Sequence, residues 1–193
     1  MQSIYNFIIK PFSKRTTAEK EIEGTTLLLN TELQNHQYTS RHGVIIAVPK
    51  VNNLGLEPGD EIIVHHNVFR RFRDVRGKEK NSASYYQEDM FFIYQDQIFA
   101  YKRNNGWQPI KGYTFIKPII DKREFAESSE RPFIGVVKYA DEGFNKEELV
   151  GFKPGTEYEF NIEGQKLYRV PTNKITIKYE YQGDEEEYNP GWA

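Results

Sequence analysis

The chain has 193 residues, of which 38% are hydrophobic and 15% aromatic, with a formal net charge of −2 and no cysteine. This charge gives no global attraction to nucleic acid or to anionic membranes, and the lack of cysteine excludes disulfides and cysteine-ligated metal sites. No apolar run approaches the roughly 20 residues of a membrane helix, and no secretory signal surrounds the apolar residues Phe7–Ile9. We therefore expect a soluble, cytoplasmic protein without a membrane partner.

Short apolar or alternating runs, separated by Gly, Pro and Asn, follow one another along the chain, whereas helical periodicity is nearly absent. This pattern predicts an all-β fold. The expected strands, in chain order, are Tyr5–Ile9, Gly43–Val48, Glu61–His65, Asp89–Tyr94, Gln97–Tyr101, Tyr113–Lys117, Phe133–Tyr139, Glu157–Ile162, Lys166–Val170 and Lys174–Tyr181. Turns are expected at Leu56–Asp60 and Phe152–Thr156, each built on Pro-Gly and each leading into a strand.

The first five strands and the last five have similar sequences in the same order, which indicates an internal repeat. Phe115 follows Phe7 by 108 residues, Gly135 follows Gly43 by 92, Pro154 follows Pro58 by 96 and Lys166 follows Met90 by 76. The falling offsets predict that the second copy has shorter loops. We expect a first domain at residues 1–103, a linker at 104–111, a second domain at 112–182 and an acidic C-terminal tail at 183–193.

In its first half the chain resembles the GroES-type co-chaperonins, also called the 10-kDa chaperonin family, over nearly the whole length of that family. The matching segments, in order, are Phe7–Pro11, Leu27–Leu29, Gly43–Val48, Leu56–Asp60 and Gln95–Tyr101. The ordered set and its partial recurrence in the second half carry the resemblance. It implies two tandem GroES-like small β-barrels, the second degenerate and without the mobile loop of the family.

Two segments depart from the family pattern. A short stretch between Val48 and Gly55 replaces the roof hairpin, and a longer, charged loop lies between His65 and Gln87. These differences favour a divergent, phage-encoded version of the family, which would act in the host cytoplasm.

The segment from about residue 14 to 40 is the candidate partner-binding arm. Its flanks are too polar to fold alone, yet Leu27, Leu28 and Leu29 stand together beside Thr25 and Thr26. The resemblance implies that the leucines dock in the apical groove of a chaperonin, and that the threonines stand where the family has paired glycines. The alternative is that the three leucines form an ordinary buried strand.

The resemblance also implies a ring. In the family, the first and closing strands of neighbouring subunits meet and form a heptamer, so the expected contact residues here are Phe7, Ile8, Ile9, Ile98, Phe99 and Tyr101. The implied function is to cap a GroEL-type chaperonin in a nucleotide-dependent way and to help enclose an unfolded client protein. The alternatives are a virion or other structural assembly protein that reuses the barrel, and a nucleic-acid-binding barrel.

No catalytic motif, metal site or cofactor is expected. His65 and His66 are adjacent, which on a strand would point them to opposite faces. The basic run Phe69–Arg73, followed by Arg76, Lys78 and Lys80, has the residue types that bind nucleic acid, but a solvated loop anchored by its two phenylalanines is the favoured interpretation. The acidic tail is expected to be solvated, with anchoring of Trp192 in a neighbouring subunit as the alternative.

Overall fold

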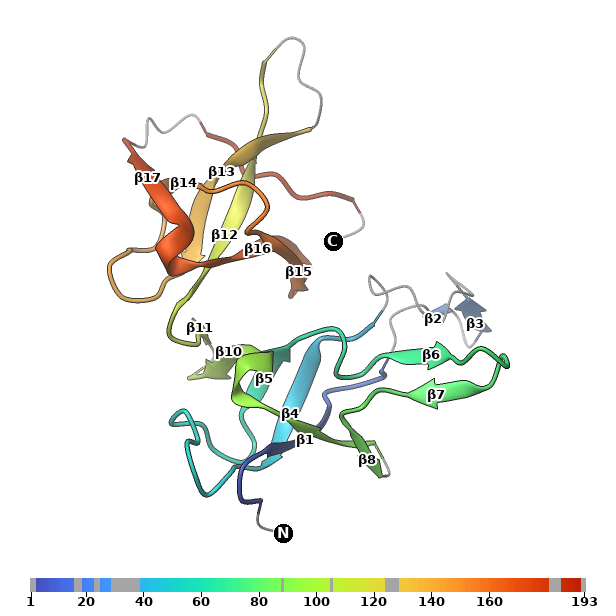
Figure 1. Ribbon diagram of the computed structural model, residues 1–193. Helices are drawn as coiled ribbons and strands as arrows, with labels where there is room; N and C mark the ends of the chain where they lie inside the picture. The colour runs from blue at the N-terminus through green and yellow to red at the C-terminus, as the bar shows by residue number, and fades with distance from the viewer. Residues whose placement is uncertain are drawn as a thin grey trace. The chain divides into compact units, whose positions relative to one another are not determined.

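The computed structural model describes residues 3–15, 19–22, 25–28, 39–87, 89–104, 106–123, 129–180 and 185–191, with the backbone only for 19–22 and 25–28 (Figure 1). The chain divides into two compact units, Met1–Gly106 and Trp107–Ala193. Among these residues no helix has the length and apolar character needed to cross a membrane.

The first unit is built on a seven-stranded antiparallel sheet with the order β11-β10-β5-β4-β1-β9-β8. Its strands are β1 (Phe7–Pro11), β4 (His42–Ala47), β5 (Glu61–Val64), β8 (Tyr85–Gln87), β9 (Met90–Ile93), β10 (Ile98–Arg103) and β11 (Gly106–Pro109). Two separate two-stranded ribbons accompany it: β2 (Glu19–Ile22) with β3 (Thr25–Leu28), and β6 (Arg71–Arg73) with β7 (Glu79–Asn81). The predicted linker therefore contains a strand, β11, over most of its described residues.

The core of the first unit is aromatic and β-branched. Phe7, Ile9 and Phe91 are fully buried, and the ring of Phe69 meets that of Phe91 edge to face at 4.9 Å between centroids. Such residues pack well on a pleated surface, which explains why short alternating runs become strands here.

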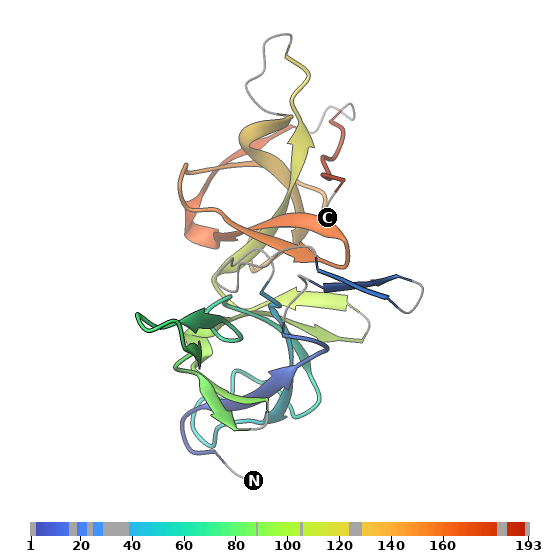
Figure 2. The ribbon, with the colours of Figure 1, turned by 90° about the vertical axis from the view of Figure 1, so that its right-hand side faces the viewer.

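The second unit is a six-stranded antiparallel sheet with the order β15-β16-β12-β13-β14-β17. Its strands are β12 (Tyr113–Ile120), β13 (Glu130–Tyr139), β14 (Leu149–Phe152), β15 (Tyr158–Ile162), β16 (Gln165–Pro171) and β17 (Ile175–Tyr179). In both units the strands curve around a central core (Figures 1 and 2). The all-β, antiparallel prediction is confirmed. Whether either sheet closes into a barrel is not settled by these strand orders, and the barrel remains a prediction.

The two sheets have the same topology. The order β8-β9-β1-β4-β5-β10 of the first unit corresponds, strand for strand, to β15-β16-β12-β13-β14-β17 of the second. The irregularities correspond too, because both central strand pairs contain a bulge, between Ile8 and Ile9 in one and between Phe115 and Ile116 in the other. A 3₁₀ turn precedes the last of these strands in each unit, at η2 (Gln95–Gln97) and η3 (Thr172–Lys174).

The strand register corrects the predicted alignment of the repeat. Pro11 lies opposite Gly43, and Pro118 lies opposite Gly135, so the central strands are related by 107 residues and not 108. Likewise β16 follows β9 by 77 residues and not 76, since Ile8 faces Phe92 and Phe115 faces Arg169.

The predicted match of the two Pro-Gly turns is wrong. Ile62 of β5 and Val150 of β14 occupy the same place, opposite Gly43 and Gly135. The Pro58 turn therefore comes before its strand, whereas the Pro154 turn comes after its strand. The strand at Tyr158–Ile162 is the counterpart of β8 and not of β5.

Gly43 and Gly135 are equivalent, and both stand where the central strand approaches closely. A Cβ at Gly43 would lie 3.1 Å from the carbonyl oxygen of Lys10, and one at Gly135 would lie still closer to the carbonyl oxygen of Lys117. A side chain at either position would collide with backbone, which accounts for glycine in both copies.

Candidate partner-binding arm

The arm leaves the first sheet through a hydrogen-bonded neck that prolongs the β1–β4 pair. The backbone N–H of Phe12 donates to the carbonyl of His42 at 3.0 Å, and that of Ser40 donates to the carbonyl of Arg15 at 3.0 Å. Thr39 and Ser40 are buried although both are polar. The chain is thus held on both sides of the segment 16–38.

Arg15 is the central clamp of this neck. Its guanidinium donates to Oδ1 of Asn81 at 2.9 Å and to the carbonyl of Phe69 at 3.3 Å, and it lies over the Phe91 ring at 4.9 Å. Burial, followed by the nearby charge of Arg71, lowers the pKa of Arg15 from its ordinary value. The buried cation is compensated by carbonyl, amide and aromatic partners, and it joins the neck to the base of the β6–β7 ribbon.

His42 supports the other side of the neck. Its ring stacks on Phe12 at 4.1 Å between centroids with an interplanar angle of 11°. Its Nε2 lies 2.9 Å from Oε2 of Glu61, which fixes the orientation of the ring. Two polar contacts on different strands therefore define how the arm departs.

The arm itself contains a hairpin. β2 and β3 pair antiparallel, with Leu28 opposite Glu19 and Leu27 opposite Lys20, and Thr26 and Thr25 opposite Glu21 and Ile22. Within the part of the chain that the structure describes, this ribbon belongs to neither main sheet. The segment predicted to lack regular structure thus carries its own short ribbon, while Leu29 lies outside the described residues.

The predicted subunit-contact residues lie in the interior of the first unit. Phe7, Ile8, Ile9, Ile98 and Phe99 are buried and Tyr101 is half-buried. β1 lies between β4 and β9, and β10 lies between β5 and β11. A contact between subunits at these strands would have to displace a paired strand. The outer strands are instead β8 and β11 in the first sheet, and β15 and β17 in the second.

The C-terminal segment is docked, contrary to the prediction of a solvated tail. The Ile120 N–H donates to the carbonyl of Glu186 at 2.7 Å, and the Tyr188 N–H donates to the carbonyl of Pro118 at 2.8 Å. Residues 186–188 thereby continue the ladder along β12 beyond the last residue that β16 pairs, Ile116. Trp192 lies outside the described residues.

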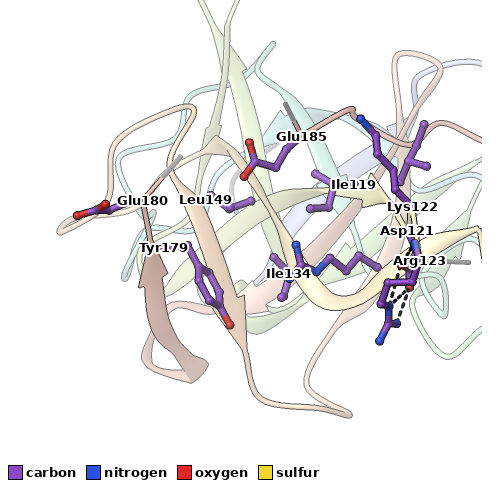
Figure 3. A pocket seen from close by; sticks show the side chains of 11 residues that line it. Ile119, Asp121, Lys122, Arg123, Ile134, Leu149, Tyr179, Glu180 and Glu185 are labelled. Carbon is purple, nitrogen blue, oxygen red and sulfur yellow. Dashed lines mark hydrogen bonds and ion pairs between the residues drawn. The ribbon is translucent and has the colours of Figure 1, made fainter. Parts of the chain in front are cut away.

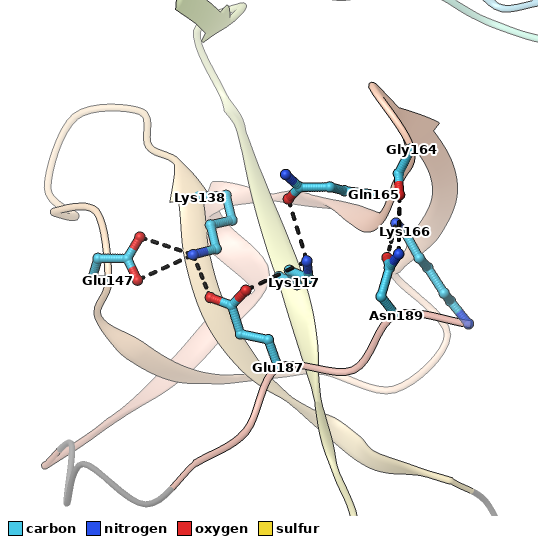
Figure 4. A network of polar contacts seen from close by, with 8 residues as sticks. All are labelled: Lys117, Lys138, Glu147, Gly164, Gln165, Lys166, Glu187 and Asn189. Atoms are coloured by element: carbon cyan, nitrogen blue, oxygen red, sulfur yellow. Dashed lines mark hydrogen bonds and ion pairs between the residues drawn. The ribbon is translucent and has the colours of Figure 1, made fainter. Parts of the chain in front are cut away.

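A polar network fixes this tail (Figure 4). Glu187 lies between Lys138 and Lys117, with 3.4 Å to Nζ of Lys117. Asn189 accepts the Lys166 N–H at 2.9 Å and donates to the carbonyl of Gly164 at 3.0 Å. Burial opposes ionisation of Glu187, but the hydrogen bond and charge of Lys138 and the charge of Lys117 outweigh it, so the pKa of Glu187 lies below its usual range.

A neighbouring cavity of about 450 Å³ opens on the second unit, with Ile119, Ile134 and Leu149 among its apolar lining (Figure 3). At its rim Asp121 accepts from Arg123 at 2.5 Å. The hydrogen bond from Arg123 holds the pKa of Asp121 at about 2 despite the opposing effect of burial. A carboxylate so firmly ionised is a weak base, so Asp121 serves here as the partner of an arginine.

The β6–β7 ribbon carries exposed cations. Asp74 accepts the N–H groups of Arg76 and Lys78 at 2.9 Å each and closes the turn, while Glu79 pairs with Arg71 at 2.9 Å. The acidic residues are thus used within the ribbon. Val68 and Phe69 are buried at its base, and Phe72 is half-buried, so one of the two predicted aromatic anchors is in the core.

The two adjacent histidines differ from the prediction. His65 follows the last residue of β5, and the rings of His65 and His66 lie 4.3 Å apart, since strand alternation has ended there. Among the described residues, no group of three or more His, Asp or Glu side chains is placed to hold a metal ion.

No family model matches the chain, and no curated protein matches it. The internal repeat, the anchored arm and the docked tail are therefore the observations from which a function can be argued.

Proposed function

We propose that the protein is a co-chaperonin, which uses the β2–β3 arm to bind a GroEL-type chaperonin ring and cap it in a nucleotide-dependent way. The observation that carries the proposal is an arm with Thr25–Leu28 on its own ribbon, held at its base by the Arg15 neck. A firm base and a separate ribbon are what a detachable contact requires.

The energetics of such an arm suit reversible capping. Burial of one leucine side chain contributes roughly 1.5–3 kcal/mol, and part of this is lost when the arm is ordered. One arm would therefore bind weakly, whereas a ring of subunits with several arms would gain strongly through avidity. In this proposal the partner hydrolyses ATP, and the chain described here is not an enzyme.

The duplicated sheet supports the finer part of the proposal, two tandem GroES-like barrels of which only the first keeps the arm. We propose a homo-oligomeric ring, with seven subunits as the resemblance implies. The outer strands β8, β11, β15 and β17 present backbone groups that pair readily with another chain. These strands, and not β1 and β10, are the proposed places of subunit contact.

The test is co-migration of the full chain with a GroEL-type ring in gel filtration, with and without ATP or ADP. We expect a nucleotide-dependent complex, loss of capture with Leu28→Asp, and normal capture with Val75→Asp. Val75 is a matched control because it is fully exposed beside the turn of the other ribbon. Capture that survives Leu28→Asp would contradict the proposal, and an intact ring that never binds a chaperonin would favour a structural assembly protein.

A second candidate function is supported by the charge of the β6–β7 ribbon. Arg73, Lys78 and Lys80 are exposed, and their side chains make no ion pair within the described residues, with the half-buried Phe72 between them in the ribbon. Cations next to an aromatic ring suit single-stranded nucleic acid. A salt-dependent gel shift with single-stranded oligonucleotides, lost in the Arg73→Ala/Lys80→Ala double variant, would support this candidate.

A further inference from the structure

The repeat reveals a groove in the first unit where the second unit holds its own tail. The groove has a volume of about 410 Å³ and is lined by Lys10, Pro11, Ser13, Ile46, Asp89 and Met90. By the register of the two sheets, Lys10 and Pro11 correspond to Lys117 and Pro118. In the second unit, the segment 186–188 runs along this part of the central strand.

The correspondence extends to the hydrogen-bonding groups. Ser13 is the counterpart of Ile120, whose N–H binds the tail at Glu186. Within the described part of the chain, the Ser13 N–H has no acceptor. The carbonyl of Pro11 is the counterpart of the Pro118 carbonyl, which accepts from Tyr188. Because donor and acceptor directions alternate along a strand, Pro11 and Ser13 offer the same ladder as the occupied groove.

The side chains differ in a way that defines the occupant. Ile46 and Lys138 are the extra residues of the same bulge, and Ile46 is 38% exposed whereas Lys138 binds Glu187. Lys10 is exposed and has no carboxylate partner among the described residues, whereas its counterpart Lys117 is buried beneath Glu187. The first groove thus keeps one cation and replaces the other with an apolar surface.

We propose that this groove binds an extended segment of a partner protein, which adds to β1 as an antiparallel strand. The segment carries a carboxylate for Lys10 next to apolar side chains for Ile46 and Met90. Backbone pairing supplies the affinity and the alternate side chains supply the selectivity, as in other β-strand additions. The chain's own tail cannot fill both grooves at once, because residues 186–188 are already bound to β12.

The groove adjoins the neck of the arm. Asp89, which lines the groove, lies 4.0 Å from the guanidinium of Arg15, and Ser13 is only two residues before Arg15. A bound strand would therefore extend the sheet directly beside the base of the arm. The inference rests on the repeat and not on the chaperonin proposal, and either can fail without the other.

The probe is a fluorescein-labelled peptide with the sequence of residues 183–191, titrated into the full chain and followed by anisotropy. Ser13→Pro removes the N–H that would bind the probe, and Ser13→Ala, its matched control, keeps that N–H. We expect about tenfold weaker binding with Ser13→Pro, as loss of one charge-free hydrogen bond allows, and unchanged binding with Ser13→Ala. Ile46→Lys restores the second lysine and should tighten binding by about fivefold.

Amide chemical shifts locate the site independently of these variants. Shifts at Lys10, Ser13 and Met90 on addition of the probe would support the proposal. It would be overturned if wild-type chain did not bind the probe, if Ile46→Lys left the affinity unchanged, or if shifts appeared only at Ile119 and Ile120. Self-association that disappears when the chain is shortened to residue 183 would assign the groove to a second copy instead, and would likewise overturn a partner protein.

Discussion

The two units share one sheet topology but differ in what is attached to the central strand. In the first, β1 continues into a clamped neck that carries the arm, and the groove beside it is open. In the second, a shorter connection joins β12 to β13, and the equivalent groove is occupied by the C-terminal segment. The comparison indicates that one copy presents binding surfaces, whereas the other is sealed by its own chain.

The largest expected effect tests the equivalence of the two central glycines. Gly135→Ala should destabilise the second unit by about 3 kcal/mol and Gly43→Ala the first by about 1 kcal/mol, since the added Cβ meets backbone in both cases but far more closely at Gly135. Denaturant unfolding, followed by amide signals from each unit, measures both values. Equal costs, or none at Gly135, would mean that the close approach to Lys117 is not a constraint.

A smaller effect is expected at the neck, which only the first unit has. Arg15→Lys removes the forked contacts with Asn81 and Phe69 and should cost about 1–2 kcal/mol. Amide exchange of Ser40, whose N–H binds the Arg15 carbonyl, should accelerate. Arg73→Lys, at an exposed arginine of the β6–β7 ribbon, is the control and should change neither quantity. Unaltered exchange at Ser40 in Arg15→Lys would contradict the clamp.

The smallest effect is a pH dependence confined to the second unit. Because the pKa of Glu187 is lowered in the folded chain, its ionised form favours folding above the pKa of the unfolded state. This contribution decreases as the pH falls through the lower, folded value, and Glu187→Gln should reduce the dependence. The partly exposed position of Glu187 keeps the effect modest. Unfolding at pH 7 and pH 3 measures it, and an identical pH profile for Glu187→Gln would rule out this role.

The sequence predicted the all-β class and most of the main strands, because alternating aromatic and β-branched runs report directly on pleated, half-buried surfaces. It did not predict β14. Leu149–Phe152 is short, buried on all four residues and interrupted by Gly151, and the nearby Pro154-Gly155 turn suggested a different register. A local turn motif was thus given more weight than strand pairing, which only long-range contacts define.

The docked tail could not be read from the sequence for a related reason. An acidic segment before the C-terminus is typical of a solvated end. Lys117 and Lys138 lie on different strands, and only the paired sheet brings them together around Glu187. The open groove was equally hidden, because its recognition depends on the register that relates Lys10 to Lys117.

The most direct test of the central claim is amide exchange of β2–β3 in the full chain, alone and with a GroEL-type ring and ATP. The account predicts that the amides of Thr25–Leu28 become strongly protected only in the presence of the ring and nucleotide, while those of the β6–β7 ribbon do not change. Protection of Thr25–Leu28 that is the same with and without the ring would contradict it.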